Sequence, residues 1–197
     1  EATNLGAGIY DVTVTDINGC TIERSVELTE PLPLDATTEV TTSYNGEDVS
    51  CAGATDGAAR ANPFDGTPGY TYFWDANAGN QTTRTATGLG AGTYSVTITD
   101  NNACTIERQV VLTEPVQLAA TTSVTSDYFG QDITCNGEAD GTAIVNPSHG
   151  TPGYSYQWDA NAGGQTTQEA TGLSADTYFI TVTDANSCSI VTSVTVT

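Results

Sequence analysis

Apolar and polar residues alternate along most of this chain, which is the pattern of β-strands with one buried face. From Tyr94 to Thr99, Tyr, Val and Ile alternate with Ser and Thr. Asp100–Ala103 has the composition of a tight turn, and apolar residues then recur on one face of a returning strand that ends near Leu112. Threonine is abundant and good helix formers are sparse, so the pattern predicts an all-β protein without helices.

Aromatic residues mark a further predicted strand. The segment "GTPGYTYFW" turns at Pro68–Gly69 and then places its aromatic rings on one face, opposite strands with small residues such as Ala59 and Ala61. "LGAGTY" resembles the corner before strand F of an immunoglobulin-like sandwich, a fold of about seven short strands. The aromatic residues that we expect in the core, rather than on a sugar-binding surface, are Tyr72, Trp74, Tyr94, Tyr156, Trp158 and Tyr178.

The same unit occurs more than once. Tyr10, Tyr94 and Tyr178 are each 84 residues apart, and so are Cys20, Cys104 and Cys188. This period exceeds that of solenoid repeats and suits small independent domains. The sequence therefore predicts tandem immunoglobulin-like β-sandwich modules arranged end to end: residues 1–31 as the C-terminal part of a truncated repeat, 32–115 as a complete repeat and 116–197 as a second, nearly complete repeat.

The composition excludes several partners. The chain has 24 acidic residues, four arginines and no lysine, which gives a formal net charge of −20. Because no basic patch exists, binding to nucleic acid or to an anionic membrane has no electrostatic basis. No stretch approaches the ~20 apolar residues of a membrane-spanning helix, so membrane insertion is not predicted. An acidic surface favours solubility and divalent cations.

Several motifs together resemble one known family. They are "TPGYTYFW", "GLGAGTYSVTITDNNACTIERQVVLTEP" and an upstream Cys-x-Gly-x-x-Asp-Gly at Cys51–Gly57 and Cys135–Gly141. The combination resembles the SprB-type repeat of cell-surface adhesins from gliding Bacteroidetes, a sandwich akin to the polycystic-kidney-disease type. The resemblance covers essentially the whole chain. It implies an extracellular, non-enzymatic, filamentous protein of the outer cell surface, whose partners are other repeats of the same long chain. "SYNGED" and "DYFGQD" look like an insertion relative to the commoner form.

Five cysteines allow three pairing schemes, and a fourth alternative is that they stay reduced and free. Pairing within a module joins Cys51 to Cys104 and Cys135 to Cys188, and leaves Cys20 unpaired by truncation. Pairing across the linker joins Cys20 to Cys51 and Cys104 to Cys135, whereas a Cys51–Cys188 bond would tie one module to the next. We favour the first scheme because closing a ~53-residue loop contributes roughly 4 kcal/mol. An immunoglobulin strand order argues against it, since it places Cys51 and Cys104 at opposite ends. Oxidised pairs predict an extracellular compartment.

The acidic hairpin turns have two interpretations. Asp and Asn side chains cap their own backbone in tight turns, which explains Asp-x-Asn at the same place in each copy. Alternatively, oxygen atoms of turn and linker bind Ca²⁺ at the module junctions and stiffen them. The ligands would then be Glu30, Asp100, Asn102, Glu114, Asp184 and Asn186. No loop resembles an EF-hand, and no other cofactor is predicted.

Catalytic residue types are not repeated with the module. His149 is the only histidine, and its counterpart 84 residues earlier is Asp65. No cysteine–histidine cluster has zinc spacing, and no Gly-rich loop joins a strand to a helix. The sequence therefore predicts no catalytic residue and no enzyme activity.

Three functions are compatible with these features. We favour a repeat segment of a large secreted adhesin, a stalk or filament that extends from the cell and carries force in adhesion or gliding. Alternatives are a repeat that binds surface polysaccharide or a substratum by avidity, and the accessory stalk of a secreted enzyme. Phe73 and Gln157 are expected on the outer face and differ between copies, which disfavours a shared sugar platform.

Overall fold

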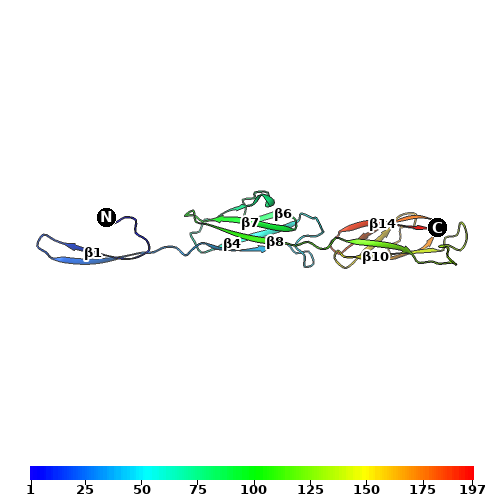
Figure 1. Cartoon of the computed structure of the whole chain (residues 1–197), viewed down its shortest axis with the longest axis horizontal. Coiled ribbons are helices and arrows are strands. Elements are labelled where there is room, and N and C mark those ends of the chain that lie inside the picture. The colour runs from blue at the N-terminus through cyan, green and yellow to red at the C-terminus, as the bar shows by residue number, and fades with distance from the viewer.

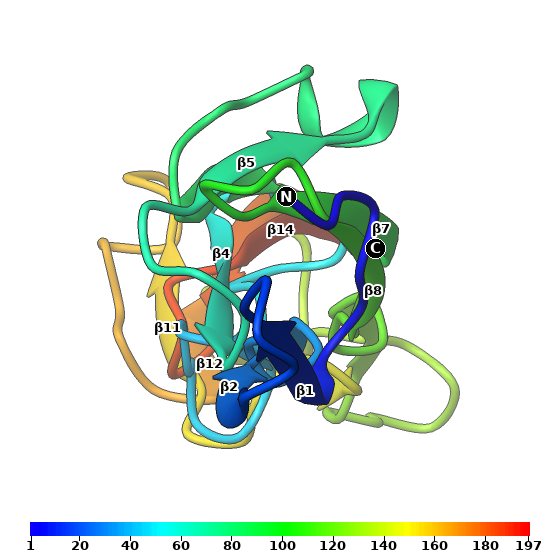
Figure 2. The ribbon, with the colours of Figure 1, turned by 90° about the vertical axis from the view of Figure 1, so that its left-hand side faces the viewer.

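The computed structural model describes residues 1–197 and shows three all-β units in a row (Figure 1). The N-terminal hairpin consists of β1 (Gly8–Thr15) and β2 (Thr21–Leu28), the first sandwich of β3–β8 and the second sandwich of β9–β14. The units lie end to end along one axis, with the C-terminus at the far end of the second sandwich. Figure 2 looks down this axis from the hairpin end.

Each sandwich contains two three-stranded antiparallel sheets. In the first sandwich, one sheet has the order β3–β4–β6 and the other β5–β7–β8; in the second, the orders are β9–β10–β12 and β11–β13–β14. The strand bounds are β3 Asp35–Val40, β4 Gly57–Phe64, β5 Thr71–Trp74, β6 Thr85–Leu89, β7 Gly92–Thr99 and β8 Thr105–Leu112. In the second sandwich they are β9 Ala119–Val124, β10 Gly141–Ser148, β11 Ser155–Trp158, β12 Glu169–Leu173, β13 Asp176–Thr183 and β14 Ser189–Val196.

This strand order is that of an immunoglobulin-like sandwich without strand D, so the fold prediction is confirmed. The count of about seven strands was one too high. Between β5 and β6 the chain instead forms a single 3₁₀ turn at Ala76–Ala78, whose N-cap Asp75 accepts a hydrogen bond from the Ala78 N–H. The tyrosine corner is present in both copies: the Tyr94 hydroxyl donates to the Gly90 carbonyl at 3.0 Å, and Tyr178 donates to Ser174 at 3.0 Å.

A tryptophan fills the centre of each core. The Trp74 side chain is fully buried and donates its indole N–H to the Thr83 carbonyl at 2.9 Å, while Trp158 does the same to Thr167. The facing strands carry fully buried alanines, which leave space for the indole ring. Of the other aromatic residues expected in the core, Tyr94 and Tyr178 are buried, and Tyr72 and Tyr156 are half-buried and pack against it.

Gly57 closes the core at the start of β4. A Cβ atom there would lie 2.6 Å from Leu112 Cδ2 and 2.8 Å from the Leu89 carbonyl oxygen, so only glycine fits. This explains the last position of the Cys-x-Gly-x-x-Asp-Gly motif as a packing requirement.

The N-terminal hairpin has the pattern of β7–β8 without their burial. Its two strands pair over their whole length. Val12 and Val14 are 53% and 56% exposed, whereas their counterparts Val96 and Ile98 are fully buried. Alternation therefore suffices to form the strands, but burial requires the opposing sheet.

Candidate functional site: the junction between the sandwiches

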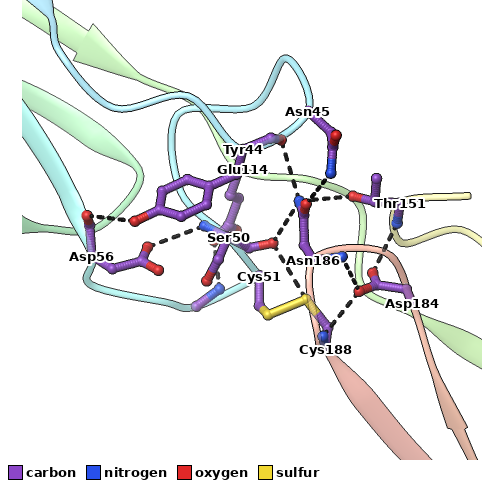
Figure 3. The surroundings of a disulfide bond; sticks show 11 residues. Tyr44, Asn45, Ser50, Cys51, Asp56, Glu114, Thr151, Asp184, Asn186 and Cys188 are labelled. Atoms are coloured by element: carbon purple, nitrogen blue, oxygen red, sulfur yellow. Dashed lines mark hydrogen bonds between the residues drawn. A yellow bond between two sulfur atoms is a disulfide. The ribbon is translucent and has the colours of Figure 1, made fainter. Parts of the chain in front are cut away.

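A disulfide bond links the two sandwiches (Figure 3). It joins Cys51, in the β3–β4 loop of the first sandwich, to Cys188, just before β14 of the second. The two Cα atoms are 5.7 Å apart, although the residues are 137 positions apart in sequence. The bond therefore ties two folded units together at the place where their ends meet.

This bond corrects the predicted pairing of Cys51 with Cys104 and of Cys135 with Cys188. The β3–β4 loop and the β7–β8 turn lie at opposite ends of a sandwich, separated by eight-residue strands that span ~27 Å. A disulfide needs Cα atoms within about 7 Å. The remaining cysteines, Cys20, Cys104 and Cys135, are free and exposed. In the entropic model, closing the longer, 137-residue loop lowers the conformational entropy of the unfolded chain and so stabilises the folded state by about 5 kcal/mol.

Asn186 lies at the centre of the junction (Figure 3). Its amide nitrogen is within hydrogen-bonding distance of the Tyr44 carbonyl (3.2 Å) and the Ser50 carbonyl (3.1 Å) of the first sandwich, and of the Thr151 hydroxyl (3.0 Å) of its own. Its amide oxygen accepts a hydrogen bond from the Asn45 side chain. Since a carboxamide both donates and accepts, this one side chain engages both partners of the interface.

The turn that carries Asn186 is organised by Asp184, which is only 5% exposed. One carboxylate oxygen accepts from the Asn186 and Cys188 N–H groups at 2.9 Å, and the other accepts from the Thr151 N–H at 2.8 Å. Asp100 holds the equivalent turn of the first sandwich in the same way. Hydrogen bonds from the backbone, above all from Thr67, lower the pKa of Asp100 below its ordinary value.

The loop before Cys51 is shaped by the inserted segment. Tyr44 and Glu47 exchange backbone hydrogen bonds of 2.8 and 3.1 Å and so close a tight turn. The Asp56 carboxylate accepts the Ser50 N–H at 3.0 Å, and hydrogen bonds from Ser50 lower the pKa of Asp56. Desolvation, together with the nearby Asp56 carboxylate, raises the pKa of the Tyr44 phenol. These bonds place the Ser50 carbonyl and Cys51 at the tip of the sandwich.

Acidic side chains fasten this loop to the linker. The Glu114 carboxylate accepts the Gly53 N–H at 2.6 Å, and Asp48 accepts both the backbone N–H (2.7 Å) and the hydroxyl (2.8 Å) of Thr113. On the other side, the Val116 carbonyl accepts the Gly150 N–H at 2.9 Å. The linker is thus bonded to both sandwiches, and a hollow of about 350 Å³ beside the disulfide is lined by residues of linker, loop and turn.

Three of the six predicted calcium ligands make hydrogen bonds at the junction. Glu114 binds a backbone N–H, Asp184 accepts three backbone N–H groups, and Asn186 bridges the two sandwiches. Asp100 and Asn102 form a turn at the opposite end of the first sandwich, and Glu30 lies beyond the hairpin strands. No group of three or more His, Cys, Asp or Glu side chains is arranged to hold a metal ion. The hydrogen bonds of Asp100 and Asp184 are those of turn-forming carboxylates, whereas Glu30 and Glu114 lie in the linkers.

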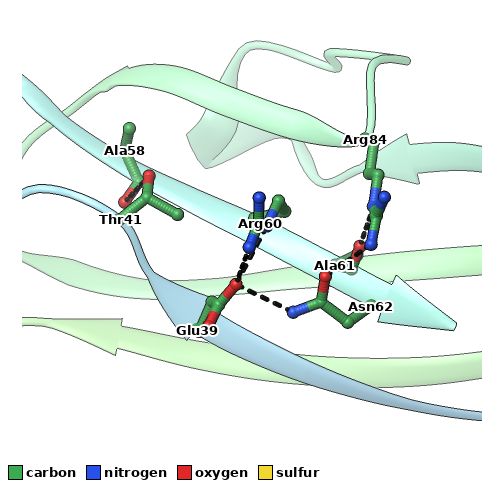
Figure 4. Close-up of polar contacts among 7 residues, drawn as sticks. All are labelled: Glu39, Thr41, Ala58, Arg60, Ala61, Asn62 and Arg84. Carbon is green, nitrogen blue, oxygen red and sulfur yellow. Dashed lines mark hydrogen bonds and ion pairs between the residues drawn. The ribbon is translucent and has the colours of Figure 1, made fainter.

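The sheet surface, in contrast, differs between the two sandwiches. In the first, the Glu39 carboxylate accepts from Arg60 at 2.9 Å and from Asn62 at 3.0 Å, and these bonds lower the pKa of Glu39, with that from Asn62 having the largest effect (Figure 4). Both charged side chains are 45% exposed, so the pair contributes little to stability. Its counterparts in the second sandwich are Ser123 and Ile144. The core and the junction elements are repeated, whereas this surface network is not.

Sequence reasoning missed the junction role of Tyr44, Asn45 and Ser50. The signal was present in the insertion "SYNGED", which contributes the loop that receives Asn186. His149 lies exposed in a loop with φ +60°, where its counterpart Asp65 has φ +58°. No helix of the chain has the length and apolar character needed to cross a membrane.

The fold and the junction define a class of protein, in which tandem immunoglobulin-like modules are joined end to end by a disulfide bond. The family model of the SprB repeat matches residues 43–79 and 130–163, which include the cysteine loop and the tryptophan strand of each sandwich. Two segments of the chain are therefore similar to the SprB repeat, as the motifs predicted. No curated protein matches this chain.

Solved structures with related folds are distant. The N-terminal eight immunoglobulin domains of Down syndrome cell adhesion molecule match with 10% identity and a TM-score of 0.43, over 97% of this chain and 28% of that one. The C-terminal fragment of intimin, in complex with the intimin-binding domain of its translocated receptor, matches with 10% identity and a TM-score of 0.35, over 95% and 57%. Fibronectin(III)-like modules of Clostridium thermocellum CbhA match with 13% identity and a TM-score of 0.30, over 81% and 93%.

Proposed function

We propose that this chain is a stalk segment of a large secreted adhesin, which extends from the cell surface and carries tension in adhesion or gliding. The observation that supports this function most directly is the disulfide between the sandwiches. A covalent bond in parallel with the linker transmits force from one module to the next without loading the chain between its ends.

The bond changes which residues tension can stretch. The covalent path from Glu1 to Thr197 through the disulfide contains residues 1–51 and 188–197, which are 61 of the 197 residues. Residues 52–187, with most strands of both sandwiches, lie outside this path. At ~3.4 Å per extended residue, the path is about 210 Å long, against about 670 Å for the whole chain.

Single-molecule pulling between the two termini tests the proposal. We expect the oxidised chain to stop extending near 210 Å, and a Cys51→Ser/Cys188→Ser variant to extend to about 670 Å through separate unfolding steps of the two sandwiches. A Cys104→Ser variant, which removes a free thiol, should behave as the oxidised parent. Extension of the oxidised parent to the full contour length at low force would refute the force-bearing role.

The polysaccharide-binding alternative predicts an aromatic surface shared by the repeats. Among the exposed aromatic residues, Phe73 and Phe179 are 53% and 54% exposed, but they occupy non-equivalent positions in the two sandwiches. Binding to a polysaccharide panel that is lost in a Phe73→Ala variant would favour this alternative. The stalk proposal expects no such binding.

A further inference from the structure

The far end of the second sandwich carries a loop equivalent to the one that receives Asn186 in the first, with Phe129 in place of Asn45. Residues 128–135 correspond to residues 44–51. Tyr128 N–H donates to the Gln131 carbonyl at 2.7 Å, the Asp140 carboxylate accepts the Thr134 N–H at 3.1 Å, and Asp132 accepts from Thr197 at 2.7 Å. Each of these bonds has its counterpart at the occupied junction. We call residues 44–51 and 128–135 the receiving loops. The second receiving loop therefore has its folded shape although no turn is docked on it.

Nothing in the chain covers this second loop. Cys135 is free and exposed, whereas Cys51 is half-buried and bonded. Tyr128 and Thr134 are exposed, although their counterparts Tyr44 and Ser50 are half-buried. A hollow of about 260 Å³ opens here, lined by Gln131, Ile133, Thr134, Cys135, Asn136, Ala175 and Thr197.

The Asp-x-Asn-x-Cys turn, which forms the other half of the junction, has the same hydrogen bonds in both sandwiches. Asp100 accepts the N–H groups of Asn102 and Cys104 at 2.9 and 2.8 Å, as Asp184 does in the bonded turn. The Asn102 amide keeps its bond to the Thr67 hydroxyl (2.8 Å), the counterpart of the bond from Asn186 to Thr151. The turn thus has the same shape with and without a receiving loop.

We propose that the end face of the second sandwich, formed by residues 128–135 and Thr197, is a docking site for the Asp-x-Asn-x-Cys turn of a further repeat of the same design. The asparagine amide of that turn bonds to the Tyr128 and Thr134 carbonyls, and its cysteine forms a disulfide with Cys135. By the same rule Cys104 pairs with the cysteine of a receiving loop placed before it.

The bond forms by oxidation of two thiols. The Cys135 thiolate attacks a small-molecule disulfide such as oxidised glutathione and releases one thiol. The cysteine of the docked turn then attacks the mixed disulfide and releases the second thiol. The glutathione disulfide thereby gains two electrons and two protons, and the protein loses them. Docking makes the second step intramolecular, which selects this pair over others.

The test extends the full chain by one repeat. A copy of residues 114–197 is appended after Thr197, which continues the 84-residue register, and Val191 in the copy is changed to Glu so that its peptides have a distinct mass. Val191 is 61% exposed, and Glu107 is its counterpart in the first sandwich. After folding in a glutathione redox buffer, we expect peptide mapping to find Cys135 joined to the copy of Cys188 and Cys51 still joined to Cys188.

Two further measurements keep the outcome decisive. A Cys135→Ser version of the extended chain should leave one additional free thiol, in the copy of Cys188, while amide hydrogen exchange in residues 128–134 stays slower than in the 197-residue chain.

A second extended chain, with a copy of residues 32–84 placed before Glu1, should join the copy of Cys51 to Cys104. Free Cys135 and Cys104 in these extended chains, or their bonding to each other, would overturn the proposal. Neither result depends on whether the existing junction carries force.

Discussion

A single residue type behaves differently at two equivalent positions. Asn102 and Asn186 sit in turns of the same geometry, and each donates to a threonine of its own sandwich. Only Asn186 also contacts the backbone carbonyls of Tyr44 and Ser50. The bond to the threonine therefore depends only on the turn itself, whereas the contribution of the asparagine to a junction depends on a neighbouring sandwich that supplies carbonyl groups.

The Asn186→Ala variant should loosen the junction without unfolding either sandwich. Each hydrogen bond lost to the first sandwich lowers the stability of the closed junction by about 1 kcal/mol. The junction then opens several-fold more often and exposes the Cys51–Cys188 bond to a reductant. The rate of reduction by dithiothreitol under native conditions measures this opening. Asn102→Ala is the matched control and should leave the rate unchanged. Equal rates in the two variants would show that Asn186 does not hold the junction closed.

At the scale of elements, carboxylates hold the turns and loops that connect the strands. Asp100 closes the β7–β8 turn, and Asp56, Asp132 and Asp140 hold the receiving loops. Hydrogen bonds from the groups that each of these four carboxylates organises lower its pKa below the ordinary value. The folded state therefore prefers their ionised forms.

The free energy of unfolding should fall in acid. A carboxyl group with a lowered pKa in the folded state stabilises it fully above the unfolded pKa of about 3.9, and loses this effect as the pH falls through the folded pKa. We expect a constant unfolding midpoint from about pH 7 to 5 and a decline below about pH 4, measured by thermal denaturation at fixed ionic strength. Asp100→Asn should have a lower midpoint at neutral pH and a shallower decline. A parallel decline in parent and variant would assign the acid effect to other groups.

The whole molecule is a row of units rather than a compact body (Figure 1). Eight-residue strands run along each unit, so a sandwich is ~35 Å long with its loops and the hairpin adds ~27 Å. The short linker between the two sandwiches, its hydrogen bonds to both of them and the disulfide hold the sandwiches in contact. The acidic charge of −20 adds repulsion against folding back, although it is screened beyond ~8 Å at physiological salt.

Small-angle scattering should report an extended particle whose shape depends on the disulfide. We expect a maximum dimension of about 100 Å for the oxidised chain, from the unit lengths above. In Cys51→Ser/Cys188→Ser the pair-distance distribution should broaden, because the hydrogen bonds then hold the junction alone. A compact, side-by-side arrangement of the oxidised sandwiches would contradict the row of units, and an unchanged profile in the variant would contradict the role of the bond in its shape.

The sequence alone determined the strands, the core and the repetition. Alternating residues such as Tyr94, Val96 and Ile98 predict buried strand faces because side-chain direction in a strand depends only on position parity. The burial of Trp74 and Trp158 could be predicted from the size of their side chains and from the small residues on the facing strands. The strand count was one too high, since the chain forms a 3₁₀ turn at Ala76–Ala78 where a seven-stranded sandwich has strand D.

Only the tertiary structure decided the disulfide and the role of the acidic turns. Every pairing scheme was compatible with an 84-residue period, and the predicted strand order argued against the favoured scheme without selecting another. Strand direction places Cys51 and Cys104 at opposite ends, and stacking of the second sandwich then brings Cys188 to Cys51. Likewise, only the structure shows that Asp184 accepts the N–H of Thr151 and Glu114 that of Gly53, since these partners lie 33 and 61 residues away in the sequence. Both outcomes depend on which groups fill the space around a side chain, and that is a property of the assembled fold.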